Sequence, residues 1–244
     1  YYFKQGNEIN LFLHGVGGCS EHFFEAFRYS KKNKGILTID LPGFGQSSKW
    51  SPSRLKITQI HIKSILFILK KLEITKFNLV LFSLATCYLQ GLINSNKWSD
   101  INKVIFIEPS ITMNDLDWSK KIYYLTATEY TNYMNRFKKD YPRLINIIFP
   151  KINKIQQAVF TKSIKSMDSS YLKKIIYESV NQIKNKTILK IFNQIEKKTI
   201  SFYSENNSLN NKKKFLEKKK SFKIKSKNHY IMLDKPKLIY SRID

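Results

Sequence analysis

Short apolar runs alternate with segments of helical periodicity through the first 107 residues of the chain. Apolar runs of this length are typical of buried strands, and apolar positions three and four apart are typical of helices that cover a sheet. The predicted strands are Tyr1–Lys4 at an edge, Ile9–Leu13, Gly35–Asp40, Leu79–Phe82 and Lys103–Ile107; the predicted helices are Glu21–Tyr29, Ile57–Leu72 and Leu84–Ile93. This alternation predicts an α/β fold, a mostly parallel sheet flanked by helices.

From Thr112 to about Ile195 the pattern becomes helical and poor in strands. The predicted helices are Ser119–Tyr124, Glu129–Lys138, Pro150–Met167, Ser170–Gln182 and Ile188–Ile195. Strand character resumes at Thr199–Tyr203. The segment is therefore interpreted as a helical insertion between two strands of one sheet, although a helical second half with no separate role fits the same pattern.

The chain is strongly basic, with Lys+Arg 43 against Asp+Glu 18 and a formal net charge of +25. Such a charge ordinarily suggests a polyanionic partner. Here the lysines are spread along the whole chain and Ile, Asn, Phe and Tyr are also abundant, as an AT-rich coding bias would produce. The densest run, Lys212–Lys220, is predicted to form the solvated face of a surface helix. We therefore predict no nucleic-acid partner; a basic surface-binding protein is supported only by charge.

Cysteine and histidine usage argues against metal and disulfide sites. Cys19 and Cys87 are too few for a disulfide scaffold, which favours free thiols in a reducing, cytoplasmic compartment. The four histidines, at positions 14, 22, 61 and 229, show no metal-ligand spacing, and no metal is predicted. His61 is interpreted as a surface or capping contact. No apolar run is long enough to span a membrane. The chain begins at Tyr1, which leaves a removed leader or trimmed start open.

Ser83 joins an apolar strand to a helix. A serine on such a turn has an exposed hydroxyl, and the following amide can donate to a developing oxyanion. The usual G-x-S-x-G pattern has glycine two residues before and after the serine; Leu81 and Ala85 stand there in this chain. Ala85 is small enough, whereas Leu81 is a bulky departure. A core strand that ends in a serine helix cap is the alternative interpretation.

Three motifs occur in a fixed order: Leu-His-Gly-Val-Gly-Gly at residues 13–18, Asp-Leu-Pro-Gly-Phe-Gly-Gln-Ser at 40–47, and the Ser83 turn. In this order and spacing the chain resembles the α/β-hydrolases over essentially its whole length. The resemblance implies that the Val16 and Leu84 amides form the oxyanion hole and that His14 only braces its loop. It also implies a core formed by residues 1–111 and 196–244, with residues 112–195 as a helical cap over the substrate pocket.

The same resemblance suggests the other catalytic residues. The segment Asn228–Pro236 is similar to the family segment that carries the catalytic histidine, which makes His229 the predicted base. Ser204-Glu205-Asn206-Asn207 resembles the turn that usually carries the acid, but Asn207 holds the acid's position. Some α/β-hydrolases place the acid after the strand that follows the nucleophile. Glu108 follows Lys103–Ile107 in this way and is the predicted acid, with Glu205 as the competitor.

The predicted function is hydrolysis of a carboxylic ester or similar small acyl compound through a serine acyl-enzyme, without a cofactor. A hydrolase-fold protein that has lost activity and only binds a ligand or partner is the alternative, supported by Leu81 and Asn207. Aromatic residues of the helical segment either line an acyl pocket or belong to the core; they are Trp118, Tyr123, Tyr124 and Tyr133. The acyl group, the alcohol and the oligomeric state stay open.

Overall fold

The computed structural model describes residues 1–49, 54–95, 97–149, 152–195, 199–205, 220–226 and 228–243. Its strands form one seven-stranded sheet in the order β1-β3-β2-β4-β5-β6-β7. The strands are β1 (Tyr2–Lys4), β2 (Glu8–Leu13), β3 (Lys34–Ile39), β4 (Phe77–Phe82), β5 (Ile101–Ile107), β6 (Thr199–Ser204) and β7 (Ser221–Ile224). Only β1 runs antiparallel to its neighbour. The predicted α/β fold with a mostly parallel sheet is confirmed.

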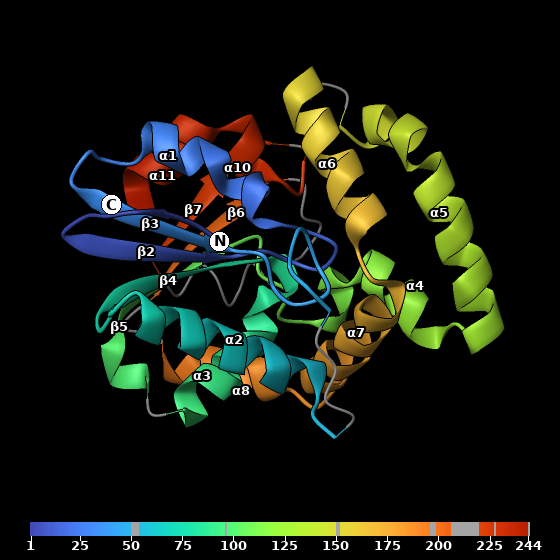
Figure 1. The fold of residues 1–244 in the computed structure, drawn as a ribbon, viewed down its shortest axis with the longest axis horizontal. Helices are drawn as coiled ribbons and strands as arrows, with labels where there is room; N and C mark the ends of the chain where they lie inside the picture. The colour runs from blue at the N-terminus through green and yellow to red at the C-terminus, as the bar shows by residue number, and fades with distance from the viewer. Residues whose placement is uncertain are drawn as a thin grey trace.

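The central strand β4 is buried along its whole length and pairs with β2 and β5. Because side chains alternate across a strand, Leu79 and Leu81 pack into the core on one face of the sheet, and Val80 and Phe82 pack into the core on the other. Figure 1 shows both faces covered by helices. One face carries α2 (Ile57–Lys71), α3 (Leu89–Asn94) and α8 (Thr187–Gln194); the other carries α1 (Phe24–Tyr29), α10 (Ile231–Asp234) and α11 (Pro236–Ile243).

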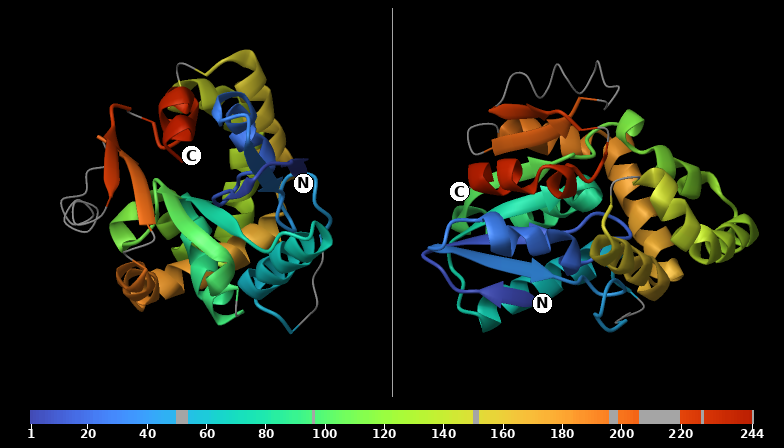
Figure 2. Two further views of the ribbon diagram at one scale, coloured as in Figure 1. Left: turned by 90° about the vertical axis from the view of Figure 1, so that its left-hand side faces the viewer. Right: turned by 90° about the horizontal axis from the view of Figure 1, so that it is seen from above.

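Four helices, which lie between β5 and α8 in chain order, lie beside one end of the sheet. They are α4 (Asp117–Tyr124), α5 (Ala127–Ile148), α6 (Lys154–Ser166) and α7 (Ser169–Lys184), drawn in green to orange in Figures 1 and 2. Glu178 attaches α7 to the first turn of α2. The Glu178 carboxylate accepts the amides of Ile57 and Thr58, 2.7 and 2.9 Å away, at the first turn of α2. These bonds satisfy helix amides that have no partner within α2.

The observed helices differ from the predicted ones in several places, among them the following two. Ser83 is followed by a 3₁₀ helix, Ser83–Tyr88, before α3 begins, where a single α-helix was predicted. Helix α5 runs on through Pro142, ten residues beyond its predicted end at Lys138. The remaining 3₁₀ segments are Ser20–Phe23, Trp98–Asp100 and Met113–Asp115. Residues 212–219 of the predicted basic surface helix lie outside the described ranges.

His61 is buried, so its interpretation as a surface or capping contact is wrong. Its Nδ1 lies 2.9 Å from the Tyr88 hydroxyl and its Nε2 lies 2.9 Å from the carbonyl oxygen of Pro42. Burial lowers the pKa of His61 to about 3, which keeps the ring neutral. The ring therefore ties α2 to two segments that converge near the carboxyl ends of the strands.

Among the described helices, none combines the length and the apolar character needed to cross a membrane.

Candidate active site

Ser83 occupies a strained turn at the carboxyl end of β4. Its φ is +54°, a value that residues other than glycine rarely adopt, and its side chain borders a cavity. Gly15, in the loop after β2, approaches this turn closely. A Cβ added to Gly15 would lie 2.9 Å from the Cβ of Ser83. Leu81, the departure from the usual pattern, directs its side chain into the core.

His229 reaches Ser83 from the loop before α10. Its Nε2 lies 2.9 Å from the Ser83 Oγ, within hydrogen-bond distance. The ring packs on Phe82, with the centroids 5.1 Å apart. The loop is held by Asn228, whose side-chain oxygen accepts the amide of Tyr230 at 3.1 Å. These contacts position the ring beside the serine hydroxyl.

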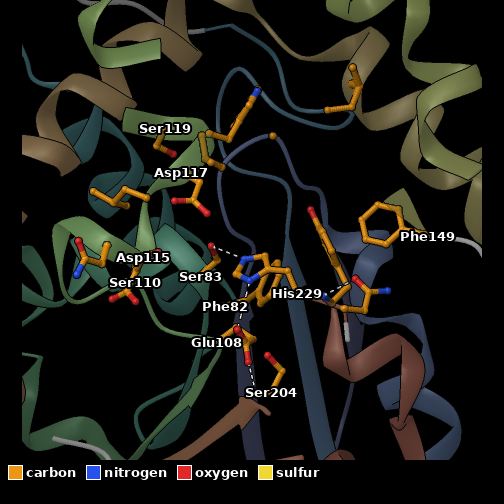
Figure 3. Close-up of a pocket in the computed structure, with 18 of the residues that line it drawn as sticks. Phe82, Ser83, Glu108, Ser110, Asp115, Asp117, Ser119, Phe149, Ser204 and His229 are labelled. Atoms are coloured by element: carbon orange, nitrogen blue, oxygen red, sulfur yellow. Dashed lines mark hydrogen bonds and ion pairs between the residues drawn. The ribbon is translucent and has the colours of Figure 1, made fainter. Parts of the chain in front are cut away.

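Glu108 lies on the other side of the His229 ring (Figure 3). One carboxylate oxygen is 3.4 Å from His229 Nδ1, and the other accepts the backbone amide of Ser204. The Glu108 side chain is 1% exposed, whereas that of His229 is 44% exposed. Like Ser83, Glu108 has a positive φ, +48°, at the end of its strand. The structure therefore brings Ser83, His229 and Glu108 into one chain of contacts, with the spacing of a nucleophile, base and acid.

The competing carboxylate, Glu205, is exposed one residue beyond β6. Its amide donates to the carbonyl of Ile224, 3.1 Å away. Glu205 is not among the described residues that line the cavity, whereas Glu108 is. Asn207, which holds the position of the usual acid, lies outside the described residues.

The loop after β2 brings Val16 to the edge of the same cavity. His14 braces this loop: Nε2 accepts the amide of Leu41 at 3.2 Å, and Nδ1 lies 2.8 Å from the carbonyl of Gly15. Burial lowers the pKa of His14, so the ring is neutral. Leu84 is the second residue of the 3₁₀ helix that starts at Ser83, and the first amides of a helix have no partner within it. Val16 and Leu84 also border one narrow space beside His14.

Asp40 anchors the second predicted motif. Its carboxylate accepts the amides of Ser20 at 2.7 Å and Gln46 at 2.9 Å. Burial acts to raise the pKa of Asp40, but these amides outweigh it and the pKa is lowered. A charged Asp40 thereby joins the loop that follows Gly18 to the turn-rich loop at Gly45.

The cavity above Ser83 has a volume of about 510 Å³. Strand ends contribute Ser83, Glu108 and Ser204, while α4, α5 and α6 contribute Trp118, Phe137, Tyr141 and Ile164. Trp118, which the sequence leaves open between an acyl pocket and the core, lines the cavity. Tyr133 holds the Trp118 ring in place, because Trp118 Nε1 donates a hydrogen bond to the Tyr133 hydroxyl at 2.7 Å. Tyr123 instead borders a separate cleft with Tyr177, and the Tyr124 side chain is exposed.

Several lining residues were not predicted from the sequence. They are Asn114, Asp115, Asp117, Tyr141, Phe149 and Tyr230. Tyr230 directly follows His229, so the histidine motif itself marks its position. Asp117 and Phe149 carry no comparable signal, because their place depends on how the helices are arranged in space.

No group of three His, Cys, Asp or Glu side chains able to hold a metal ion occurs in the described part of the chain. Cys19 and Cys87 are buried free thiols, and burial raises the pKa of each to about 12. Neither thiol is therefore activated as a nucleophile.

Comparison with known proteins agrees with the fold. A family model described as alpha/beta hydrolase fold matches residues 11–144. MenH from S. aureus has a similar structure, with a TM-score of 0.72 and 17% identity over 99% of this chain and 95% of that chain. An esterase (EaEST) from Exiguobacterium antarcticum has a TM-score of 0.67 and 16% identity, over 99% of this chain and 92% of that chain. The epoxide hydrolase CorEH has a TM-score of 0.73 and 10% identity, over 98% of this chain and 90% of that chain. No curated protein sequence matched the chain.

Proposed function

The chain belongs to the alpha/beta hydrolase fold family, and we propose that within this family it is a serine hydrolase that cleaves a carboxylic ester or a similar acyl compound. The observation that carries the proposal is the contact chain from Ser83 Oγ to His229 Nε2, 2.9 Å, and from His229 Nδ1 to Glu108, 3.4 Å. A hydroxyl, an imidazole and a buried carboxylate in this order form the arrangement that activates a serine for acyl transfer.

The first half of the reaction forms an acyl-enzyme. Ser83 Oγ attacks the ester carbonyl carbon while His229 Nε2 takes the hydroxyl proton. The carbonyl oxygen becomes an oxyanion, which the amides of Val16 and Leu84 stabilise. The ester C–O bond then breaks, and His229 gives its proton to the departing alcohol. Glu108 stabilises the imidazolium that exists between these two proton transfers.

The second half releases the acid. A water molecule attacks the acyl carbon while His229 takes one of its protons, and a second tetrahedral oxyanion forms at the same amides. The bond to Ser83 Oγ breaks and the serine recovers its proton from His229. The products are one carboxylic acid, one alcohol and the original enzyme, so no cofactor is consumed.

Residues 112–195 act in this proposal as a cap on a core formed by residues 1–111 and 196–244. Support comes from the cavity, whose walls include residues of α4, α5 and α6 as well as the strand ends. The segment is also attached to the core at its end, where the rings of Phe192 on α8 and Phe106 on β5 lie 4.9 Å apart. We also place the protein in the cytoplasm, because its two described cysteines are free thiols.

The inactive alternative rested on Leu81 and Asn207. Leu81 packs into the core and Ser83 still adopts the strained turn, so the missing glycine does not argue against activity. Glu108 supplies a carboxylate beside His229, which makes an acid at position 207 unnecessary. Both points favour an active triad.

Ester turnover with trapping of the acyl-enzyme tests the proposal. Short-chain p-nitrophenyl esters should give a burst of p-nitrophenol, and mass spectrometry of the quenched protein should find the acyl group on Ser83. Ser83→Ala and His229→Ala should abolish the burst. Ser64→Ala is the matched control, because the Ser64 hydroxyl bonds the carbonyl of Ile60 within α2. A full burst from folded Ser83→Ala protein would refute the proposal.

A further inference from the structure

The cavity above Ser83 has walls of aromatic rings. They are Phe82, Trp118, Phe137, Tyr141, Phe149 and Tyr230. Neighbouring rings meet at different angles: the planes of Phe149 and Tyr230 are 84° apart, and those of Trp118 and Phe137 are 37° apart. The rings are therefore not coplanar, and the walls that they form offer aromatic surface in more than one orientation. Ring faces carry the negative end of the aromatic quadrupole.

The charged residues on these walls have one sign. Glu108, Asp115 and Asp117 line the cavity, while the described lining residues include no lysine or arginine. This contrasts with the whole chain, whose formal net charge is +25. Glu108 faces His229, and Asp115 accepts the amides of Ile111 and Thr112. Asp117 is the carboxylate that is left to meet a ligand.

Asp117 is the first residue of α4, and its side chain is exposed. Figure 3 shows its carboxylate on the Ser83 side of the cavity, turned toward the serine. The lysine one turn later, Lys121, lies over the Tyr133 ring, with Nζ 4.9 Å from the centroid. Lys121 therefore does not neutralise Asp117 in this arrangement. The amino-terminal dipole of α4 offsets part of the carboxylate charge, which limits the expected effect.

We propose, resting on the proposed function, that the preferred substrate is an ester with a cationic group, a substituted ammonium, that binds between the aromatic walls and Asp117. Aromatic faces attract such a cation, and quaternary ammonium groups are recognised by cages of this composition. A weakly hydrated trimethylammonium group also loses little solvation on entering. The same walls disfavour an ester that carries a free carboxylate, because the described lining residues include no lysine or arginine to pair with it.

Binding to Ser83→Ala protein tests this inference without requiring turnover. Three p-nitrophenyl esters with equal acyl chains are compared by calorimetry, ending in a trimethylammonium, a tert-butyl or a carboxylate group. A parallel pair is the choline ester and its tert-butyl isostere. Salt at ~0.15 M screens the charge of the rest of the surface. The trimethylammonium compound of at least one pair should bind about tenfold more tightly than its isostere, since a partly exposed cation–π contact and a screened carboxylate each supply a few fold.

Asp117→Asn in the same background should reduce the preference for the cation about threefold. Asp140→Asn is the matched control, because it removes the same charge from an exposed position on α5; it should leave the preference unchanged. Equal or weaker binding of both cationic compounds relative to their isosteres would overturn the inference. An equal loss of preference in both variants would also overturn it, because the effect would then come from net charge.

The outcomes for the two proposals are separable. If the wild-type protein hydrolyses the neutral esters while the Ser83→Ala protein shows no preference for the cation, the specificity inference fails and the hydrolase proposal stands. If the preference is found but no ester is turned over, the pocket inference stands for a binding protein and the hydrolase proposal fails.

Discussion

Glu108→Gln removes one negative charge from the end of β5 and preserves the size and shape of the side chain. The amide oxygen of glutamine can still accept the backbone amide of Ser204, as the carboxylate does now. It cannot stabilise a positively charged His229 in the same way. The variant therefore isolates the electrostatic part of the proposed acid's role.

The size of the effect follows from the distance and the exposure. Two unit charges 3.4 Å apart attract by about 5 kcal/mol at an effective dielectric constant of about 20. The His229 side chain is 44% exposed, so water stabilises part of the imidazolium charge in the variant. We expect a net loss of about 3 kcal/mol in the transition state, which is about a hundredfold in kcat/KM.

The assay is kcat/KM on one p-nitrophenyl ester, with circular dichroism to establish that the variant is folded. Glu205→Gln is the matched control, because it makes the same chemical change at an exposed turn one residue beyond β6, and its rate should stay within twofold. If Glu108→Gln keeps its rate within threefold, the carboxylate is not the triad acid. A large loss confined to Glu205→Gln would assign that role to Glu205.

Two further substitutions test the loop and the buried histidine near the site. Gly15→Ala should lower kcat/KM by about a hundredfold, since its Cβ would lie 2.9 Å from that of Ser83 and a displacement of about 1 Å costs that much; an unchanged rate contradicts this. Burial lowers the pKa of His22 to about 3, so the unfolded chain takes up a proton below about pH 6.5 while the folded protein does not, and the folded state loses stability as the pH falls toward 3. When the pH is lowered from 7.5 to 5, the free energy of unfolding of His22→Phe, measured in urea, should therefore rise by about 2 kcal/mol relative to that of wild type. An equal difference between the two proteins at both pH values would refute the reasoning.

Most of the sheet could be predicted because six of its seven strands leave a local signal; β7 was not predicted. The apolar runs around Leu11, Leu79 and Ile105 are continuous, as parallel strands buried on both faces require. The site residues follow from the same signal, because Ser83 and Glu108 each come directly after a strand and the carboxyl ends of parallel strands share one edge. The pairing of His229 with Ser83, 146 residues away, came from the ordered motifs.

The arrangement of the helices over that edge could not be predicted in the same way. Trp118 and Tyr123 lie on one helix and look equally suited to a pocket, yet only Trp118 lines the cavity above Ser83. His61 looked like a surface residue because its partners, the Tyr88 hydroxyl and the Pro42 carbonyl, are brought to it only by tertiary packing. The local pattern of a helix shows which face is apolar and leaves open what covers it.

Covalent labelling of Ser83 tests the account most directly. A fluorophosphonate reacts with a serine hydroxyl only when a neighbouring base activates it and an oxyanion site accepts the phosphoryl oxygen. The account predicts a single adduct that peptide mapping places on Ser83, absent from Ser83→Ala and formed much more slowly by His229→Ala. Folded wild-type protein that stays unlabelled, or that carries its adduct on another serine while Ser83 is unmodified, would contradict it.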